Sequence, residues 1–206
     1  YYVNDWSTGG GHQKTALATS PDLSSHRWTV STDREGRIIA ALPVSRERWM
    51  NSQSTYHSIQ RLQSGLWIAF LRGVGGEYDA EGEWHQDVGK LGFAVSRDGR
   101  RWAEAPGNPI IHAGDGQAGK TGVYRPLFLA KDGSELLLAW SESDFYDSNP
   151  RLMFGLTRDL RTVTRIAAPL PAWTLSDGPA SLWLQGQTLY VYQGSNIAII
   201  HPAGSR

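Results

Sequence analysis

Residues 90–99 read KLGFAVSRDG, and this pattern recurs along the chain. It aligns without a gap with KTALATSPDL at residues 14–23 and with RLMFGLTRDL at residues 151–160, and SNIAIIHPAG at residues 195–204 resembles a degraded fourth copy. Each copy predicts a β-strand that ends in a polar Ser/Thr-x-Asp-Leu/Gly turn, whose aspartate accepts hydrogen bonds from the backbone N–H groups that follow. Such self-similarity is typical of folds built from repeated units.

Two other kinds of segment recur around this pattern in a fixed order. A run rich in β-branched and aromatic residues precedes each copy: YYV at residues 1–3, LWIAF at 66–70, ELLLAW at 135–140 and TLYVY at 188–192. A third kind precedes those runs: YHSI at residues 56–59, YRPL at 124–127 and DGPA at 177–180. A less regular fourth stretch, such as NPII at residues 108–111, follows the turn. Three or four strands per unit, about 45–70 residues apart, are typical of β-propeller blades.

These repeats predict an all-β protein that folds as a β-propeller with about four recognisable blades. A β-sandwich would also have short alternating strands, but it does not require ordered triplets of strands to recur. No linker, charge run or low-complexity stretch divides the chain, so residues 1–206 are expected to form a single domain. Residue 1 falls within a second strand and residue 206 soon after a third. The domain is therefore expected to begin and end within a blade, with open strand edges that an oligomer would cover.

Composition excludes several classes of function. The chain of 206 residues has 20 Lys and Arg against 20 Asp and Glu, so its charge indicates no nucleic-acid partner. It has no cysteine, hence no disulfide, thiolate metal site or thiol nucleophile. No apolar run approaches the roughly 20 residues that span a bilayer, so no membrane partner is expected. The first residues lack the pattern of a signal peptide, which leaves the compartment open, with secretion or the periplasm as the expectation if a signal was removed.

The repeats resemble the five-bladed β-propellers of glycoside hydrolase family 43 and its relatives, including the family 32 fructosidases. The matching residues are AVSRDGRRW at 94–102, PGNPII at 106–111, YRP at 124–126 and DGP at 177–179. The resemblance extends over nearly the whole sequence, and most of the matching residues belong to the scaffold of the fold, so it indicates the architecture more than the activity. It implies a propeller of the five-bladed type. Because the chain is shorter than such enzymes, we expect either a fragment of such a propeller or a ring of fewer blades.

Glycoside hydrolysis needs two carboxyl groups that flank the scissile bond. The resemblance implies that they lie on innermost strands: an Asp-Pro in the first blade, an Asp in the second and a Glu before Gly-Pro in the third. Asp177, before Gly178-Pro179, matches the position of the acid, although its side chain is one methylene shorter than that of Glu. The other positions hold His57-Ser58 and Arg125-Pro126, and the first-blade segment would precede residue 1. We therefore take Asp177 as the candidate acid, with either Glu142 or an aspartate of the segment that would precede residue 1 as its candidate partner.

Further candidates would bind the substrate. Arg125, beside Tyr124 on a predicted innermost strand, would need a carboxylate or a ligand oxygen in a narrow channel. His57 could orient a sugar hydroxyl, although a lone histidine on a strand is more often a packing residue. The remaining candidates are Trp140 and Asp144, near the end of one strand, and Trp84, in the acidic loop 73–89. That loop is long enough to suggest a role, and its alternative interpretation is a solvated acidic loop.

The sequence thus predicts a glycosidase that acts on plant or microbial polysaccharides and is of the arabinofuranosidase, xylosidase or fructosidase type. The alternative is a catalytically inactive propeller that binds carbohydrate or a protein, which the substituted positions favour. A third hypothesis is a sialidase-like propeller, because Ser96-x-Asp98-Gly99-x-x-Trp102 resembles the Asp-box turn but is one residue short. No cofactor and no metal site are expected from the spacing of residues, and calcium at the axis stays open.

Overall fold

The computed structural model confirms the all-β class. It describes residues 2–5, 13–22, 24–42, 48–87, 89–112, 122–132, 135–144, 148–166, 180–185, 188–193 and 196–200. Over these residues the one helical element is the single 3-10 turn η1 (Arg48–Met50). No helix among them is long and apolar enough to span a bilayer.

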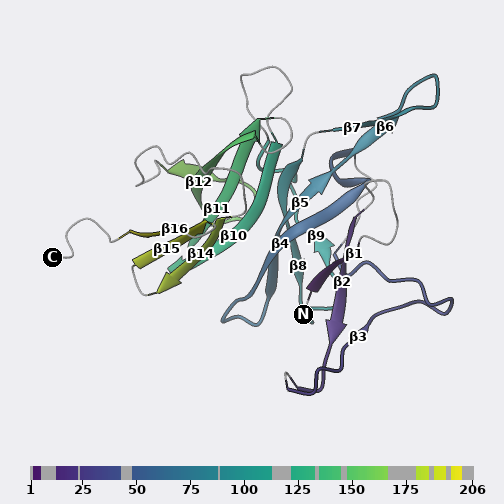
Figure 1. The fold of residues 1–206 in the computed structure, drawn as a ribbon, viewed down its shortest axis with the longest axis horizontal. Helices are drawn as coiled ribbons and strands as arrows, with labels where there is room; N and C mark the ends of the chain where they lie inside the picture. Colours follow the sequence, from purple (N-terminus) through teal and green to yellow (C-terminus); the bar gives the residue numbers. More distant parts are fainter. Residues whose placement is uncertain are drawn as a thin grey trace.

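The strands form four successive antiparallel sheets and one short ribbon (Figure 1). The first sheet contains β1 (Tyr2–Asp5), β2 (Lys14–Thr19) and β3 (Thr29–Val30). The second contains β4 (Gln53–Arg61), β5 (Trp67–Val74), β8 (Lys90–Ser96) and β9 (Ala103–Glu104). The third contains β10 (Gly122–Asp132), β11 (Glu135–Asp144), β12 (Ser148–Thr157) and β13 (Thr164–Ile166). The fourth contains β14 (Ala180–Gln185), β15 (Thr188–Gln193) and β16 (Asn196–Ile200). In each sheet neighbouring strands are consecutive along the sequence, apart from the ribbon of β6 (Gly76–Tyr78) and β7 (Trp84–Gln86) inserted after β5.

Each kind of repeat occupies one position in its sheet. The KLGFAVSRDG segment and its two ungapped copies form β8, β2 and β12, which all follow the strand built from a β-branched and aromatic run. The predicted aspartate turns are confirmed. The Oδ1 of Asp98 accepts hydrogen bonds from the backbone N–H groups of Arg101 and Arg100, both at 2.8 Å. Asp22 and Asp159 accept the equivalent pairs.

The fourth stretch of the second sheet differs from the prediction. The strand that pairs with β8 is Ala103–Glu104, whereas residues 108–111 form no strand and have one isolated β-bridge to β8, between Ile111 and Leu91. The cause is Asn108, whose side chain takes the place of a backbone partner. Its Oδ1 accepts from the N–H of Phe93 at 2.9 Å, and its Nδ2 donates to the carbonyl of Phe93 at 2.8 Å.

The core lies between the faces of successive sheets. Phe70 and Phe93 of the second sheet stack at 5.0 Å, and Phe128 of β10 stacks on Phe93 at 6.2 Å. The cluster around them also contains the buried Leu138 and Trp140 of β11. A second cluster packs Leu42, Trp49 and Met50 on the other face of β5 and β8. Each fully buried large side chain contributes about 1.5–3 kcal/mol, so sheet stacking supplies most of the stabilisation visible here.

Candidate functional site

The first strands of successive sheets lie next to one another. β4 contacts β10, and β10 contacts β14 (Figure 1). The segments of Tyr56 and Tyr124 therefore meet, as the sequence predicted for innermost strands. Asp177 lies outside the described residues, three positions before β14 begins, so the candidate acid has a known neighbouring strand but no described position.

Both β4 and β10 carry a bulge at the end where the strand begins. In β4, Thr55 pairs with Arg72 and His57 with Leu71, so Tyr56 is an extra residue, and its φ of 40° is unusual for a side chain of its size. In β10, the register shifts between Tyr124 and Leu127. A bulge at the start of an inner strand re-aims the side chains around it, which is a common feature of binding sites.

The register corrects one predicted equivalence. The second and third sheets can be aligned strand by strand, starting from their aspartate turns. In this alignment Arg72 of β5 corresponds to Ser141 of β11. Arg72 pairs with Thr55 and Ser141 pairs with Tyr124, so Thr55 and Tyr124 occupy equivalent positions. Arg125 is thus the counterpart of Tyr56, not of His57. Thr55 precedes Arg72 by as many residues as Tyr124 precedes Ser141, because the second irregularity of β10, between Phe128 and Ala130, is balanced by a shorter connection to β11. The predicted equivalence was wrong because it matched Tyr56 with Tyr124, and this match is one residue out of register with the strand pairing.

His57 joins the second sheet to the first. The Oγ1 of Thr15, on β2, donates to the carbonyl oxygen of Ser54 at 2.8 Å and lies 3.2 Å from Nδ1 of His57. Thr15 and Ser54 are fully buried. Three buried oxygens at this seam have no hydrogen-bond partner among the described groups: Gln13 Oε1, Ser54 Oγ and Thr55 Oγ1. Buried polar atoms normally have partners, so the seam has the character of a site that holds water or ligand hydroxyls.

Arg72 is a buried cation that the sequence analysis missed. Its side chain lies at the end of β5, opposite Thr55, and the residue is 6 % exposed. Its Nη1 donates to Oε1 of Gln53 at 3.5 Å, and its guanidinium lies 5.6 Å from the centre of the Tyr56 ring. The sequence feature that could have indicated this residue is an arginine near the end of a strand that is otherwise apolar. Such a buried guanidinium, close to the bulge, favours binding of a ligand oxygen nearby.

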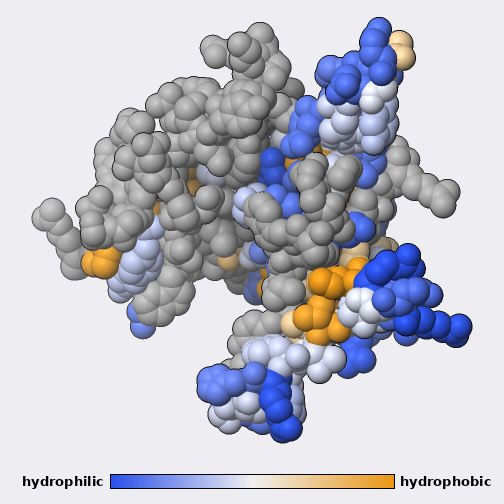
Figure 2. Space-filling model, turned by 45° about the vertical axis from the view of Figure 1, so that its right-hand side comes forward, coloured by the Kyte–Doolittle hydropathy of each residue, from blue (hydrophilic) through white to orange (hydrophobic). Residues whose placement is uncertain are grey.

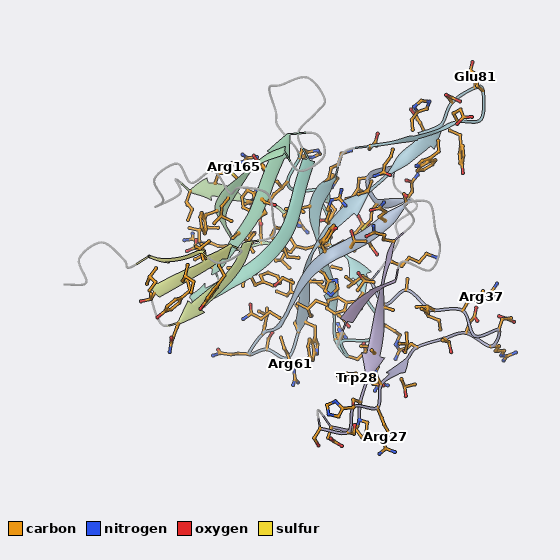
Figure 3. All side chains as sticks on the ribbon, viewed as in Figure 1. Arg27, Trp28, Arg37, Arg61, Glu81 and Arg165 are labelled. Carbon is orange, nitrogen blue, oxygen red and sulfur yellow. The ribbon has the colours of Figure 1, made fainter. Side chains whose placement is uncertain are left out.

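Glu142 has its carboxylate engaged by two neighbours. Trp140 Nε1 donates to Glu142 Oε1 at 3.0 Å, and Arg165 of β13 forms an ion pair with the same oxygen at 2.8 Å. The guanidinium of Arg165, labelled in Figure 3, also lies 5.8 Å from the centre of the fully buried Trp140 ring. Both contacts make Glu142 a hydrogen-bond acceptor, which is the role of an ionised carboxylate and not of a proton donor. Asp144 follows on β11, and its side chain lies outside the described ones, as do those of Tyr124 and Arg125.

The predicted acidic loop 73–89 is largely a β-ribbon, β6 and β7, that projects beyond β5 (Figure 1). Trp84 packs edge-on against Tyr78, with ring centres 5.0 Å apart, and Tyr78 is 66 % exposed. Asp79 accepts from the N–H groups of Glu81 and Glu83 in the turn. Figure 2 shows this ribbon, at the upper right, as mostly hydrophilic surface. Trp84 is therefore held near the end of the sheet where β4 begins, on a solvated arm.

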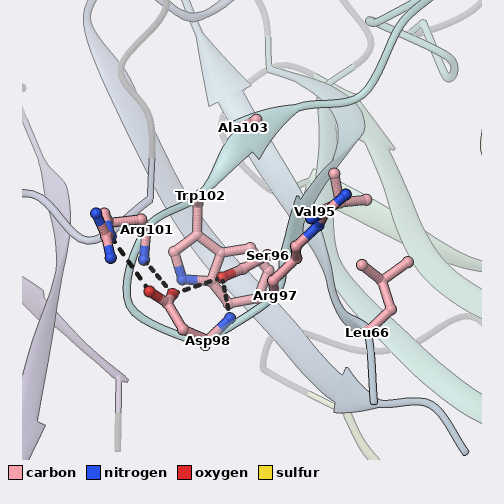
Figure 4. Close-up of a pocket in the computed structure, with 8 residues that line it drawn as sticks. All are labelled: Leu66, Val95, Ser96, Arg97, Asp98, Arg101, Trp102 and Ala103. Carbon is pink, nitrogen blue, oxygen red and sulfur yellow. Dashed lines mark hydrogen bonds and ion pairs between the residues drawn. The ribbon is translucent and has the colours of Figure 1, made fainter. Parts of the chain in front are cut away.

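A groove with a volume of about 580 Å³ lies at the other end of the second sheet (Figure 4). Leu66, Val95 and Trp102 line it together with the Asp98 turn. That turn lies beside the start of β5, since Ser96 pairs with Trp67, whereas His57 and Arg72 lie at the opposite end. The carboxylate of Asp98 is bound by the N–H groups of its own turn, so the groove offers no carboxylate for catalysis. Among the described residues, no three His, Asp or Glu side chains are grouped so that they could hold a metal ion, and calcium at the axis stays open.

Comparisons with known proteins place the fold. The chain matches no model of a known protein family and no curated protein. It is similar to a solved structure described as a glycoside hydrolase, with a TM-score of 0.61, 16 % identity and coverage of 94 % of this chain and 59 % of the other. It is also similar to a solved structure described as a complex of BT0996 and RGII, with a TM-score of 0.63, 16 % identity and coverage of 93 % and 58 %. A third is the family 32 β-fructofuranosidase BmSUC1 of Bombyx mori, with a TM-score of 0.57, 15 % identity and coverage of 93 % and 37 %.

The protein shares its fold with glycoside hydrolases. At 15–16 % identity this likeness concerns the fold, and it confirms the resemblance drawn from the repeats, including its family 32 type. The chain spans less than three fifths of the length of the first two structures.

Proposed function

We propose that the four sheets are blades of a five-bladed propeller and that they form part of a glycosidase that cleaves glycosidic bonds of plant or microbial polysaccharides. The observation that carries the proposal is the likeness to glycoside hydrolases over 93–94 % of the sequence. The meeting of β4, β10 and β14 supports it, because side chains from successive sheets can then converge on one sugar ring. An arabinofuranoside, xyloside or fructoside is the proposed substrate type.

In this proposal Asp177 is the general acid and Glu142 the ionised carboxylate. The acceptor geometry of Glu142 supports that division, since a glycosidase needs one protonated and one ionised carboxyl group. Substrate would be bound by His57, Arg125 and Tyr124 near the bulges, with Trp84 and Asp144 at the same end of the sheets. The candidate Trp140 is not retained, because its side chain is fully buried in the core between the sheets. The proposed partner is carbohydrate, and covering of open strand edges by a second copy stays a prediction.

The test is hydrolysis of nitrophenyl α-arabinofuranoside, nitrophenyl β-xyloside and sucrose by the purified protein. Cleavage of one of them is expected to fall at least about 100-fold in Asp177→Asn and in Glu142→Gln, because each removes one carboxyl group. The matched control is Glu81→Gln at the exposed tip of the ribbon, which should keep full activity. Activity that survives Asp177→Asn would overturn the assignment of the acid.

The alternative function is a propeller that binds carbohydrate without cleaving it. The observation that favours it is the lack of a carboxylate at either bulge, since β4 has Tyr56 and His57 there and β10 has Arg125 and Pro126. Calorimetric titration with xylan and arabinan oligosaccharides separates the two functions. Binding without turnover of any substrate would establish the binding module, and neither binding nor turnover would contradict both.

A further inference from the structure

The turns that follow β8 and β12 differ in one ion pair. Arg97 directly follows β8 and Arg158 directly follows β12, so the two arginines occupy equivalent positions. Leu66 and Glu135 are also equivalent, because each directly precedes the residue that pairs with the last residue of that strand. In the third sheet, Nε of Arg158 lies 3.0 Å from Oε1 of Glu135. In the second sheet, the apolar side chain of Leu66 takes the place of that carboxylate.

Leu66 lines the groove at this end of the second sheet, together with Val95 and Trp102 (Figure 4). Arg97 and Arg101 belong to the same lining, and both are exposed. Over the described residues, no carboxylate forms an ion pair with Arg97. A carboxylate from outside the chain can therefore pair with this guanidinium.

The turn holds its arginines on a fixed backbone. Oδ1 of Asp98 accepts hydrogen bonds from the backbone N–H groups of Arg100 and Arg101, both at 2.8 Å. Three arginines and one aspartate lie within residues 97–101, which leaves a surplus of two positive charges. The ion pair of Arg101 with Asp98 is 3.2 Å long, and the side chain of Arg101 is 94 % exposed, so solvent weakens the pair. The turn thus presents positive charge beside an apolar groove.

We propose that this groove binds a carboxylate-bearing sugar, a uronic acid unit of an acidic polysaccharide. The carboxylate pairs with Arg97, as in the corresponding ion pair of the third sheet, and Arg101 adds a second guanidinium. A guanidinium and a carboxylate can form two parallel hydrogen bonds, which are stronger than bonds between neutral groups. The C–H face of the sugar ring packs on Leu66 and Trp102, which removes apolar surface from water.

The choice of a sugar over an acidic peptide rests on the proposed function, because the groove by itself fits any ligand that joins a carboxylate to an apolar body. The groove is separate from the bulges of the inner strands. Trp67, beside the groove, and Arg72, beside the bulge of β4, are five residues apart on β5, which is about 16 Å. One sugar ring cannot contact both ends. The groove therefore holds a polysaccharide chain at a distance from the bond that the proposed enzyme cleaves.

Binding of two forms of one polymer tests the proposal directly. Polygalacturonate and its fully methyl-esterified form, which has no free carboxylate, are titrated into the protein in a calorimeter. We expect only polygalacturonate to bind, and its affinity should fall between about 0.05 and 0.5 M salt, because salt screens exposed charges. Equal affinity for the two polymers, or binding of neither, would overturn the proposal. Polyglutamate that binds as tightly as polygalacturonate would overturn the choice of a sugar.

Leu66→Glu tests the comparison with the third sheet. The new carboxylate should pair with Arg97, as Glu135 pairs with Arg158, and weaken binding of polygalacturonate at least about tenfold. Leu66→Gln is the neutral control of similar size and should weaken it less than about threefold. Unchanged affinity in Leu66→Glu would contradict a ligand carboxylate at Arg97. Melting temperatures check that both variants are folded.

A charge-matched control separates the groove from general attraction to a polyanion. Arg97→Gln combined with Arg101→Gln should weaken binding at least about tenfold, because both guanidinium groups of the groove are lost. Arg34→Gln combined with Arg37→Gln removes the same charge from exposed residues after β3 and should weaken binding less than about twofold. Equal losses in the two double variants would overturn the site.

Hydrolysis of the nitrophenyl glycosides, measured on the same preparations, keeps this proposal apart from the proposed function. Binding of polygalacturonate at the groove without hydrolysis would establish the groove and contradict the glycosidase. Hydrolysis without binding of polygalacturonate would support the glycosidase and overturn the groove.

Discussion

The second and third sheets follow one plan and bury an indole at the same place in two different ways. In the third sheet the indole of Trp140 and the carboxylate of Glu142 both come from β11. In the second sheet the positions of these residues hold Leu71 and Gly73, and the indole is that of Trp49 from η1, whose Nε1 donates to Glu104 Oε1 at 2.6 Å.

This difference distinguishes the residues that maintain the fold from those that could take part in a reaction. The aspartate turns at one end of these sheets use the same hydrogen bonds. Near the other end, the second strands carry different residues at equivalent positions, Arg72 and Gly73 in β5 and Ser141 and Glu142 in β11. Repetition thus maintains the turns and the stacked faces, while the ends near the bulges are free to carry different side chains. Four predictions test this division.

The largest expected effect is on the shared core. Phe93 is fully buried between the two sheets and stacks on both Phe70 and Phe128. Phe93→Ala should lower the free energy of unfolding by about 3–5 kcal/mol, because it removes apolar contacts from both sheets and leaves a cavity. Urea denaturation measures the loss, with Phe93→Leu as the milder control. A loss below about 1 kcal/mol would mean that the two sheets do not depend on this contact.

The next effect concerns the absence of a side chain at residue 73. A Cβ built on Gly73 would lie 2.4 Å from the ring of Trp49 and 2.9 Å from Cβ of Met50. Gly73→Ala should therefore cost about 1–3 kcal/mol in unfolding free energy, as overpacking does. Gly82→Ala is a contrasting control, because its Cβ would meet no atom within 4 Å and only its positive φ opposes the change. Equal losses in the two variants would argue against a packed Trp49.

Glu142 and Glu104 can be compared directly, because each accepts a hydrogen bond from an indole N–H group. Glu142→Gln and Glu104→Gln each weaken an acceptor of an indole N–H, so both should lower the free energy of unfolding by about 1 kcal/mol. Only Glu142→Gln should reduce glycoside hydrolysis, if Glu142 is the ionised carboxylate of the site. Thermal unfolding and turnover are measured on the same preparations. Equal turnover in the two variants would make Glu142 a scaffold residue like Glu104.

The smallest effect is a dependence of stability on pH. The backbone N–H groups of Arg101 and Arg100 hold the pKa of Asp98 well below its ordinary value of 3.8, and those of Arg161 and Thr162 lower the pKa of Asp159. A carboxyl group whose pKa is lower in the folded protein contributes stability above its ordinary pKa, and this is lost as pH falls. Melting temperatures measured from about pH 6 downward should therefore fall less steeply below about pH 4 in the double variant Asp98→Asn and Asp159→Asn. Identical slopes would contradict the turn hydrogen bonds.

Much of the architecture could be predicted because it is local. The repeat at residues 90–99 indicated one strand in each of the first three sheets and the turn after it, since alternation and turn residues act within about ten positions. The register was less accessible. Matching Tyr56 with Tyr124 gave an equivalence that was one residue out, and the pairing of the strands corrected it. Arg72 was overlooked because burial of its guanidinium depends on residues from other strands.

By itself, the order of residues determined the all-β class, the succession of strands in each sheet and the aspartate turns, because those features depend on neighbours along the sequence. The tertiary structure alone decided that Trp49 fills the space above Gly73, that Glu142 meets Arg165, and that Thr15 meets His57 across two sheets. These contacts join residues that are 23 to 42 positions apart. Packing of whole sheets brings them together, and no local pattern records it.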